Sequence, residues 1–273
     1  MVLTKDQCDF FWRNGYLAIP SITTSDELVK IRRIYDRLFE DRAGWEDGNY
    51  FDFAGYSEKD ADFKVPQLQM MTNYAPELFE TLYYANAEAA SRQLLGHRAK
   101  HLFDHGIRKP ARTGGETPWH QDIAFLDGDS YFESLTVWMP LQAVNAVNGC
   151  MSFVPGSHLG PVVEHRSPGG DNRANGLEAV SPDVSKAVSC PLPAGGATFH
   201  HFRTLHYAAG NHSDQLRRVL SWGFGIRRTE PVVSGTFPWI AAKDNERLHR
   251  WNSNRVLQRA KQAVVTHLNR FLT

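Results

Sequence analysis

Residues 117–122 read Thr-Pro-Trp-His-Gln-Asp and place a histidine and an aspartate two positions apart. On a β-strand, side chains at i and i+2 project from the same face, so His120 and Asp122 would point together and Gln121 would point away. An imidazole and a carboxylate that converge in this way can supply two ligands to a metal ion. Two histidines and one carboxylate, with the remaining positions open, form the facial triad typical of non-haem Fe(II) oxygenases. The motif therefore predicts an iron site if a second histidine completes it.

The strongest candidate for the third ligand is His206. Gly195-Gly196 predicts a turn and residues 197–199 predict a strand. This strand could bring His206 to the face on which His120 and Asp122 lie. Three other histidines remain alternatives because they lie near predicted turns or strands: His158, His200 and His201. A second His-x-Asp match, at His212 and Asp214, lies in a polar stretch that predicts a turn, and we interpret it as structural.

Arg217 lies eleven residues after His206 and opens a predicted strand over residues 219–224. A 2-oxoglutarate cosubstrate binds iron through its keto acid end, so its far carboxylate needs a fixed, permanently charged, bidentate partner. A guanidinium group has this chemistry. On a strand next to the one that carries His206, Arg217 would be placed for the role. The alternative is a surface arginine paired with an acid.

The stretch 44–65 is rich in aromatic side chains set among glycine and aspartate, and it predicts a loop. Its rings either pin a surface loop or form a lid or wall over an apolar substrate. In the second case Trp45, Phe51 and Phe53 would contact the substrate. Residues 161–189, which are rich in Gly, Pro, Ser and Asn, form a second candidate wall.

The remaining pattern predicts one domain over residues 1–273. Two capping boxes, which begin at Thr4 and Thr24, precede helical apolar spacing, so residues 1–98 are expected to be mainly helical, apart from a short strand over residues 16–20. Short apolar runs over about 99–228, separated by predicted tight turns such as Asn148-Gly149, predict the strands of a sandwich or barrel. A helical extension is expected over about 240–273.

Composition excludes several classes of function. The 30 basic residues balance the 30 acidic ones, which gives no attraction to nucleic acid or to anionic lipid. We expect no membrane span, because no run of apolar residues is long enough. The three cysteines form no C-x-x-C motif, and the first twenty residues do not resemble a secretory signal, so a cytoplasmic protein is expected. A monomer and a homodimer are both compatible with the sequence.

Four segments resemble the phytanoyl-CoA dioxygenase family in their order and spacing, across about residues 8 to 226: 14–20, 118–122, 148–158 and 206–217. The resemblance implies a mainly β fold, a double-stranded β-helix or jelly-roll barrel with flanking helices. It also implies Fe(II), 2-oxoglutarate and dioxygen. Within the family pattern, His120, Asp122 and His206 match the iron ligands, and Arg217 matches the arginine that binds 2-oxoglutarate. Three further residues match positions that line the cofactor pocket: His105, Gln121 and Trp138.

Two departures from the family pattern are Ala208, where the human prototype has a serine near the cosubstrate, and Gly195-Gly196 in place of Gly-Asp. Neither touches the triad. Related halogenases have a small residue at the position of Asp122, so the carboxylate favours hydroxylation or another oxidation.

The sequence thus predicts a dioxygenase that hydroxylates an unactivated C–H bond of a small metabolite, in secondary metabolism, and releases succinate and CO2. It does not separate hydroxylation from desaturation, cyclisation or epimerisation. Two alternatives remain: a jelly-roll metal oxygenase that does not use 2-oxoglutarate, and a non-catalytic jelly-roll binding module.

Overall fold

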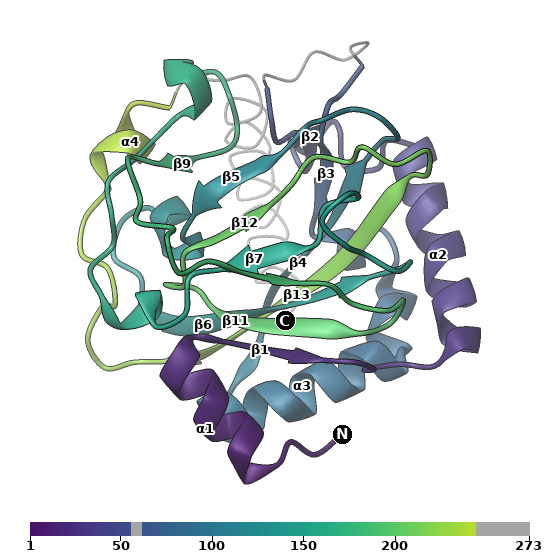
Figure 1. The fold of residues 1–273 in the computed structure, drawn as a ribbon, viewed down its shortest axis with the longest axis horizontal. Helices are drawn as coiled ribbons and strands as arrows, with labels where there is room; N and C mark the ends of the chain where they lie inside the picture. Colours follow the sequence, from purple (N-terminus) through teal and green to yellow (C-terminus); the bar gives the residue numbers. More distant parts are fainter. Residues whose placement is uncertain (56–61, 244–273) are drawn as a thin grey trace, which may run out of the picture.

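The computed structural model describes residues 1–55 and 62–243, and two antiparallel sheets form the centre of the molecule (Figure 1). The larger sheet has the strand order β1-β11-β6-β13-β4-β3-β2, and the smaller one has the order β10-β7-β12-β5. A separate pair, β8-β9, lies in the loop after β7. The mainly β jelly roll with flanking helices is confirmed, although the two sheets do not close into a continuous barrel.

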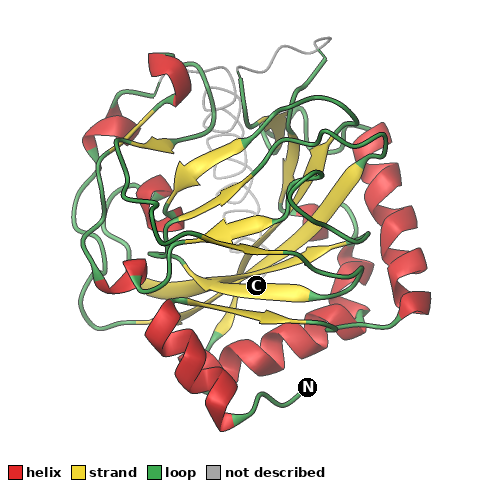
Figure 2. Cartoon of the chain, in the orientation of Figure 1, coloured by secondary structure: helices red, strands yellow, loops and turns green. Residues whose placement is uncertain are grey.

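The strands of the larger sheet are β1 (Tyr16–Ile19), β2 (Tyr50–Asp52), β3 (Pro66–Gln69), β4 (Lys100–Lys109), β6 (Phe132–Pro140), β11 (Ala197–His201) and β13 (Arg217–Arg227). Those of the smaller sheet are β5 (Thr117–His120), β7 (Met151–Phe153), β10 (Val188–Cys190) and β12 (His206–Ala208). The pair is β8 (His165–Arg166) and β9 (Glu178–Ala179). The α-helices are α1 (Lys5–Asn14), α2 (Ser25–Glu40), α3 (Leu82–Leu95) and α4 (Pro238–Ala241), as Figure 2 shows.

The N-terminal helices begin at the residues that the capping patterns predict. Thr4 and Gln7 form a complete capping box on α1, and the Thr24 hydroxyl accepts a hydrogen bond from the Glu27 amide in the first turn of α2. Residues 1–98 nevertheless contain more than the one expected strand, because three short strands from this part extend the larger sheet. One of them, β2, lies within the aromatic stretch that was expected to be a loop. It pairs with β3, and this pairing satisfies its backbone groups.

Alternation along the strands separates the two faces of the larger sheet. On β6, Leu135, Val137 and Met139 join α2 and α3 in the main hydrophobic core. Thr136 and Trp138 therefore point to the opposite face, towards the smaller sheet. Polar side chains on the inner face can thus meet between the sheets without disturbing the core.

Residues 161–189 are not entirely irregular, since they contain the β8-β9 pair and a short 3-10 turn at Pro168–Gly170. The expected C-terminal helical extension, about 240–273, lies outside the described residues apart from α4 and the two residues after it. Among the helices that the structure describes, none has the length and apolar character needed to cross a membrane.

Candidate metal centre

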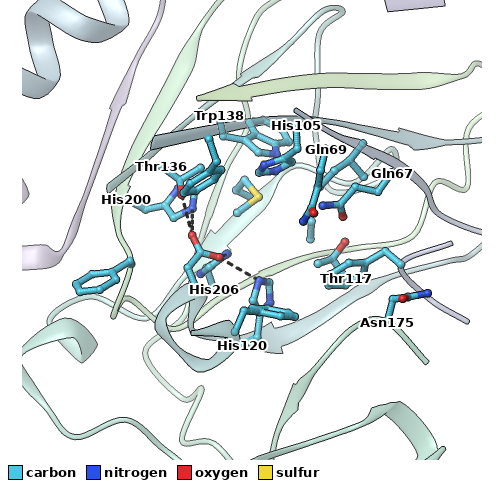
Figure 3. A pocket seen from close by; sticks show the side chains of 18 of the residues that line it. Gln67, Gln69, His105, Thr117, His120, Thr136, Trp138, Asn175, His200 and His206 are labelled. Atoms are coloured by element: carbon cyan, nitrogen blue, oxygen red, sulfur yellow. Dashed lines mark hydrogen bonds and ion pairs between the residues drawn. The ribbon is translucent and has the colours of Figure 1, made fainter. Parts of the chain in front are cut away.

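His120, Asp122 and His206 come together in one group of possible metal ligands, and Figure 3 shows His120 and His206 near each other in the pocket. His120 ends β5 and is the cross-strand partner of His206 at the start of β12. Asp122 begins a 3-10 turn, Asp122–Phe125, directly after β5. The Nε2 atoms of His120 and His206 lie 3.6 and 3.5 Å from the same carboxylate oxygen, Oδ1 of Asp122. All three ligand atoms fall within 4.8 Å of one another, which is close enough for one ion to bind them all.

Backbone carbonyls fix the orientation of both imidazoles. Nδ1 of His120 lies 2.7 Å from the Pro118 oxygen, and Nδ1 of His206 lies 2.8 Å from the Thr204 oxygen. A carbonyl only accepts hydrogen bonds, so each Nδ1 carries the proton and each Nε2 keeps a free lone pair. Metal-binding histidines are commonly held in this tautomer by a second partner.

The protonation states also suit a cation. Burial by itself would raise the pKa of Asp122, but His206, His120 and His200 outweigh it and hold that pKa well below its usual range. Burial, aided by His120, lowers the pKa of His206 well below its usual range. At neutral pH the site therefore presents a carboxylate and neutral imidazole, which are the forms that bind metal.

Of the three alternative histidines, His200 adjoins the site without joining the ligand group, and His158 and His201 lie away from it. Nε2 of His200 is 3.5 Å from the other oxygen of Asp122, Oδ2. His201 faces Glu133 at 3.4 Å, and His158 contacts the backbone oxygen of Trp12 at 3.0 Å. The second His-x-Asp match is also apart from the site, since the exposed Asp214 pairs with Arg112 on the surface.

A cavity of about 280 Å³ opens beside the three residues, and Arg217 lies in its wall. The Arg217 side chain is 1% exposed, its guanidinium lies 5.6 Å from the ring centre of Trp138, and its Nε and Nη1 atoms have no hydrogen-bond partner among the described residues. Burial lowers the pKa of Arg217 to about 10, so the group is still a cation at neutral pH. A buried cation with unused donors is costly unless a ligand meets it, which fits the far carboxylate of 2-oxoglutarate.

Lys109, which the sequence reasoning missed, stabilises the backbone between the metal site and Arg217. It is the cross-strand partner of Arg217, and its Nζ donates to the carbonyl oxygens of Ala208 and Ala209 at 2.8 and 2.7 Å. Gly149 supports the same segment: its φ is +86°, and a Cβ there would lie 2.5 Å from the Ala209 oxygen. The Asn148-Gly149 dipeptide signalled this turn, whereas nothing local marked Lys109 as buried.

Other predicted site residues are divided between the cavity and the core. Trp138, His105, Phe51 and Phe53 line the cavity. Burial lowers the pKa of His105 to about 4, so this histidine is neutral at neutral pH. Trp45 does not line the cavity, because it lies in the turn before β2 and packs against Phe63 in the main core.

Gln121 also points away from the cavity. Its Nε2 donates to the Arg203 oxygen at 2.7 Å, and its Oε1 accepts from the Val163 amide at 2.9 Å. Gln121 follows the last residue of β5 but keeps an extended backbone (φ −117°, ψ 132°), so the alternation of the strand continues past His120 and turns Gln121 to the side opposite His120. Gln121 thus stabilises the loops around the site, and the expectation that it lines the cosubstrate pocket is not met by this geometry.

Comparison with known proteins agrees with the geometry. A family model described as phytanoyl-CoA dioxygenase matches residues 11–219. A phytanoyl-CoA dioxygenase of Arabidopsis thaliana is 29% identical over 251 residues, which are 80% of this chain and 87% of the relative. EvdO2 of Micromonospora carbonacea var. aurantiaca, solved in complex with 2-oxoglutarate, is 29% identical with a TM-score of 0.74 over 89% of this chain and 98% of that one.

The carbocyclase SnoK from nogalamycin biosynthesis superposes with a TM-score of 0.66 over 86% of this chain and 88% of its own, at 22% identity, which shows a shared fold. The family match covers most of the chain, and a grouped His-Asp-His set lies beside a buried arginine. The protein is therefore a non-haem dioxygenase that uses Fe(II), 2-oxoglutarate and dioxygen, and it belongs to the phytanoyl-CoA dioxygenase family.

Proposed function

We propose that the enzyme hydroxylates an unactivated C–H bond of a small metabolite of secondary metabolism, with His120, Asp122 and His206 as the iron ligands. The observation that carries the assignment is the convergence of two Nε2 atoms on one oxygen of Asp122, with both Nδ1 protons held by backbone carbonyls. Bound iron would activate dioxygen, whose two oxygen atoms end in succinate, formed with CO2 from 2-oxoglutarate, and in the hydroxylated product. The protein supplies position, charge and exclusion of water.

Arg217 is proposed to bind the far carboxylate of 2-oxoglutarate. Its guanidinium lies in the wall of the cavity and is 1% exposed, so its hydrogen bonds to a carboxylate would be strong because water does not compete. Trp138 packs against the guanidinium and restricts its rotation. Lys109 keeps the chain after His206 at a fixed distance from Arg217 through the Ala208 and Ala209 carbonyls.

The substrate is proposed to be a free small molecule that presents apolar and neutral hydrogen-bonding groups. Phe51, Phe53 and Phe125 line the cavity near the metal site. Gln67 also lines it, and its buried Oε1 has no partner among the described residues. Apart from histidines, the ionisable lining residues in the described chain are Asp122 and Arg217, both already assigned. Among the described residues, no further cation lines the cavity to meet a charged group of the enclosed part of the substrate.

The size of the cavity limits what can enter it. Ligand pockets commonly have volumes of roughly 300–1,000 Å³. The cavity of about 280 Å³ lies just below that range, and 2-oxoglutarate must occupy part of it. We therefore propose that only the reacting part of the metabolite is enclosed.

The test is formation of succinate from 2-oxoglutarate by anaerobically purified, Fe(II)-loaded protein on exposure to air. The wild type should show slow turnover without substrate, and Asp122→Ala should show none. Asp214→Ala is the matched control, because it removes the aspartate of the other His-x-Asp motif and should keep full turnover. If Asp122→Ala forms succinate as fast as the wild type, the ligand assignment is refuted.

A second measurement separates the alternatives. Anaerobic addition of 2-oxoglutarate to the Fe(II) protein should produce a metal-to-ligand charge-transfer band. Oxygen consumption without this band and without succinate would favour a metal oxygenase that does not use 2-oxoglutarate. A protein that binds iron but neither consumes oxygen nor forms succinate would favour the binding module.

A further inference from the structure

The two oxygens of the Asp122 carboxylate have different surroundings. Oδ1 faces the Nε2 atoms of His120 and His206, whereas Oδ2 accepts a hydrogen bond from the Thr136 hydroxyl at 2.8 Å. Nε2 of His200 also lies 3.5 Å from Oδ2. Figure 3 shows Thr136 and His200 together on one side of the site and His120 on the other.

Strand register explains why both groups reach the same oxygen. Thr136 on β6 and His200 on β11 are direct cross-strand partners, so their side chains stand next to each other on the inner face of the larger sheet. Both are almost fully buried, with exposures of 3% and 1%. Thr136 and His200 are therefore buried neighbours that both contact the Asp122 carboxylate.

In the part of the chain that the structure describes, the polar contact of the buried His200 side chain is the one with Asp122. Its Nδ1 has no hydrogen-bond partner among the described residues, and the rings of Phe153 and His206 pack beside it at 5.4 and 4.5 Å. The contact with Asp122 is thus the polar contact that the structure gives this imidazole. At 3.5 Å it is longer than a strong hydrogen bond, so Thr136 should be the more important of the two.

We propose that Thr136 and His200 are positioning residues that hold Oδ2 and so leave Asp122 to bind the metal through Oδ1 alone. This inference rests on the proposed function. The terminal torsion of an aspartate has a broad energy profile, so a carboxylate without such partners can rotate and offer both oxygens. Binding through one oxygen leaves more positions of the metal open for 2-oxoglutarate and dioxygen.

The test uses anaerobic titration of the metal-free protein with Co(II), followed by its visible absorption spectrum. Loss of a partner that orients a ligand typically weakens metal binding about 10- to 100-fold. Thr136→Val should fall in this range and change the spectrum, because it keeps the shape of threonine but removes the hydroxyl. Thr136→Ser, which restores the hydroxyl, should return affinity and spectrum towards those of the wild type. His200→Phe should cause a smaller loss in the same direction.

Thr198→Val is the matched control. Thr198 is a buried threonine on the same inner face of β11, paired with Trp138, and its hydroxyl has no partner among the described residues. This variant should bind Co(II) as the wild type does. Thermal unfolding of each metal-free variant separates a general loss of stability from an effect on the site.

The outcomes are distinguishable from those of the main proposal. If the wild type fails to bind Co(II), the proposed function fails, and this inference fails with it. If the wild type binds Co(II) and both Thr136→Val and His200→Phe keep its affinity and spectrum, only the positioning role is refuted. An equal loss in Thr198→Val would also refute it, because the effect would then arise from packing in general.

Discussion

Replacement of Arg217 by methionine should abolish tight binding of 2-oxoglutarate without destabilising the metal-free protein. Methionine has a similar length and fills the same buried space, but it carries no charge and no donors. Arg217 is almost completely buried, and its Nε and Nη1 atoms have no hydrogen-bond partner within residues 1–55 and 62–243. Most of its favourable interactions are therefore expected to form only when the cosubstrate binds.

The magnitude follows from the two hydrogen bonds that a carboxylate would accept. A hydrogen bond to a charged group contributes about 1.5–3 kcal/mol, so two contribute roughly 3–6 kcal/mol. At about 1.4 kcal/mol per tenfold change, 2-oxoglutarate should bind roughly 100- to 10,000-fold more weakly. The affinity of Arg217→Lys for 2-oxoglutarate should lie between those of the wild type and Arg217→Met, because lysine keeps the charge but loses the planar pair of donors.

Thermal unfolding with and without 2-oxoglutarate measures both halves of this prediction. Ligand at a hundredfold excess over its Kd stabilises the folded state by about 2.7 kcal/mol, which should raise the Tm of the wild type by several degrees. Arg217→Met should show no such rise, while its Tm without ligand should equal or exceed that of the wild type, because an unpaired buried cation is costly.

Arg218→Met is the matched control, since the neighbouring arginine points to the other face and pairs with Asp36 at 2.7 Å. It should retain the ligand-induced rise. The reasoning is refuted if Arg217→Met binds 2-oxoglutarate as tightly as the wild type, or if its metal-free form is much less stable. The second result would mean that the guanidinium is a structural group.

Two further predictions concern the aromatic stretch and the buried histidines. Phe53 lines the cavity, so Phe53→Ala should weaken the apparent affinity for the metabolite that stimulates succinate formation. Trp45 packs in the main core instead, so Trp45→Ala should leave that affinity unchanged and lower the free energy of unfolding by about 3–5 kcal/mol. The reverse pattern would contradict the assignment. Burial lowers the pKa of both His165 and His201 to about 4, so the unfolded chain binds more protons between pH 6.5 and pH 4. The free energy of unfolding of the metal-free protein should therefore fall across this window as pH decreases, by on the order of 3 kcal/mol per histidine at pH 4. If urea unfolding gives the same free energy at pH 7 and pH 4.5, these histidines are not buried in the neutral form.

Local chemistry determined several features that the sequence predicts correctly. The hydroxyls of Thr4 and Thr24 cap helices α1 and α2, and the Asn148-Gly149 dipeptide provides the positive φ of a tight turn. The two-residue period of a strand was enough to separate His120 and Asp122 from Gln121. Such features depend on residues close in sequence, so the sequence alone reveals them.

The tertiary structure decided which distant groups meet. His206 rather than His200 faces Oδ1 of Asp122 because the register of β12 against β5 sets it opposite His120, whereas β11 brings His200 to Oδ2. Likewise, burial of Lys109 and Arg217 follows from the pairing of β4 with β13, and Trp45 is separated from Phe53 by the turn before β2. Register between strands far apart in the chain depends on the packing of both sheets at once, and no local pattern of residues contains that information.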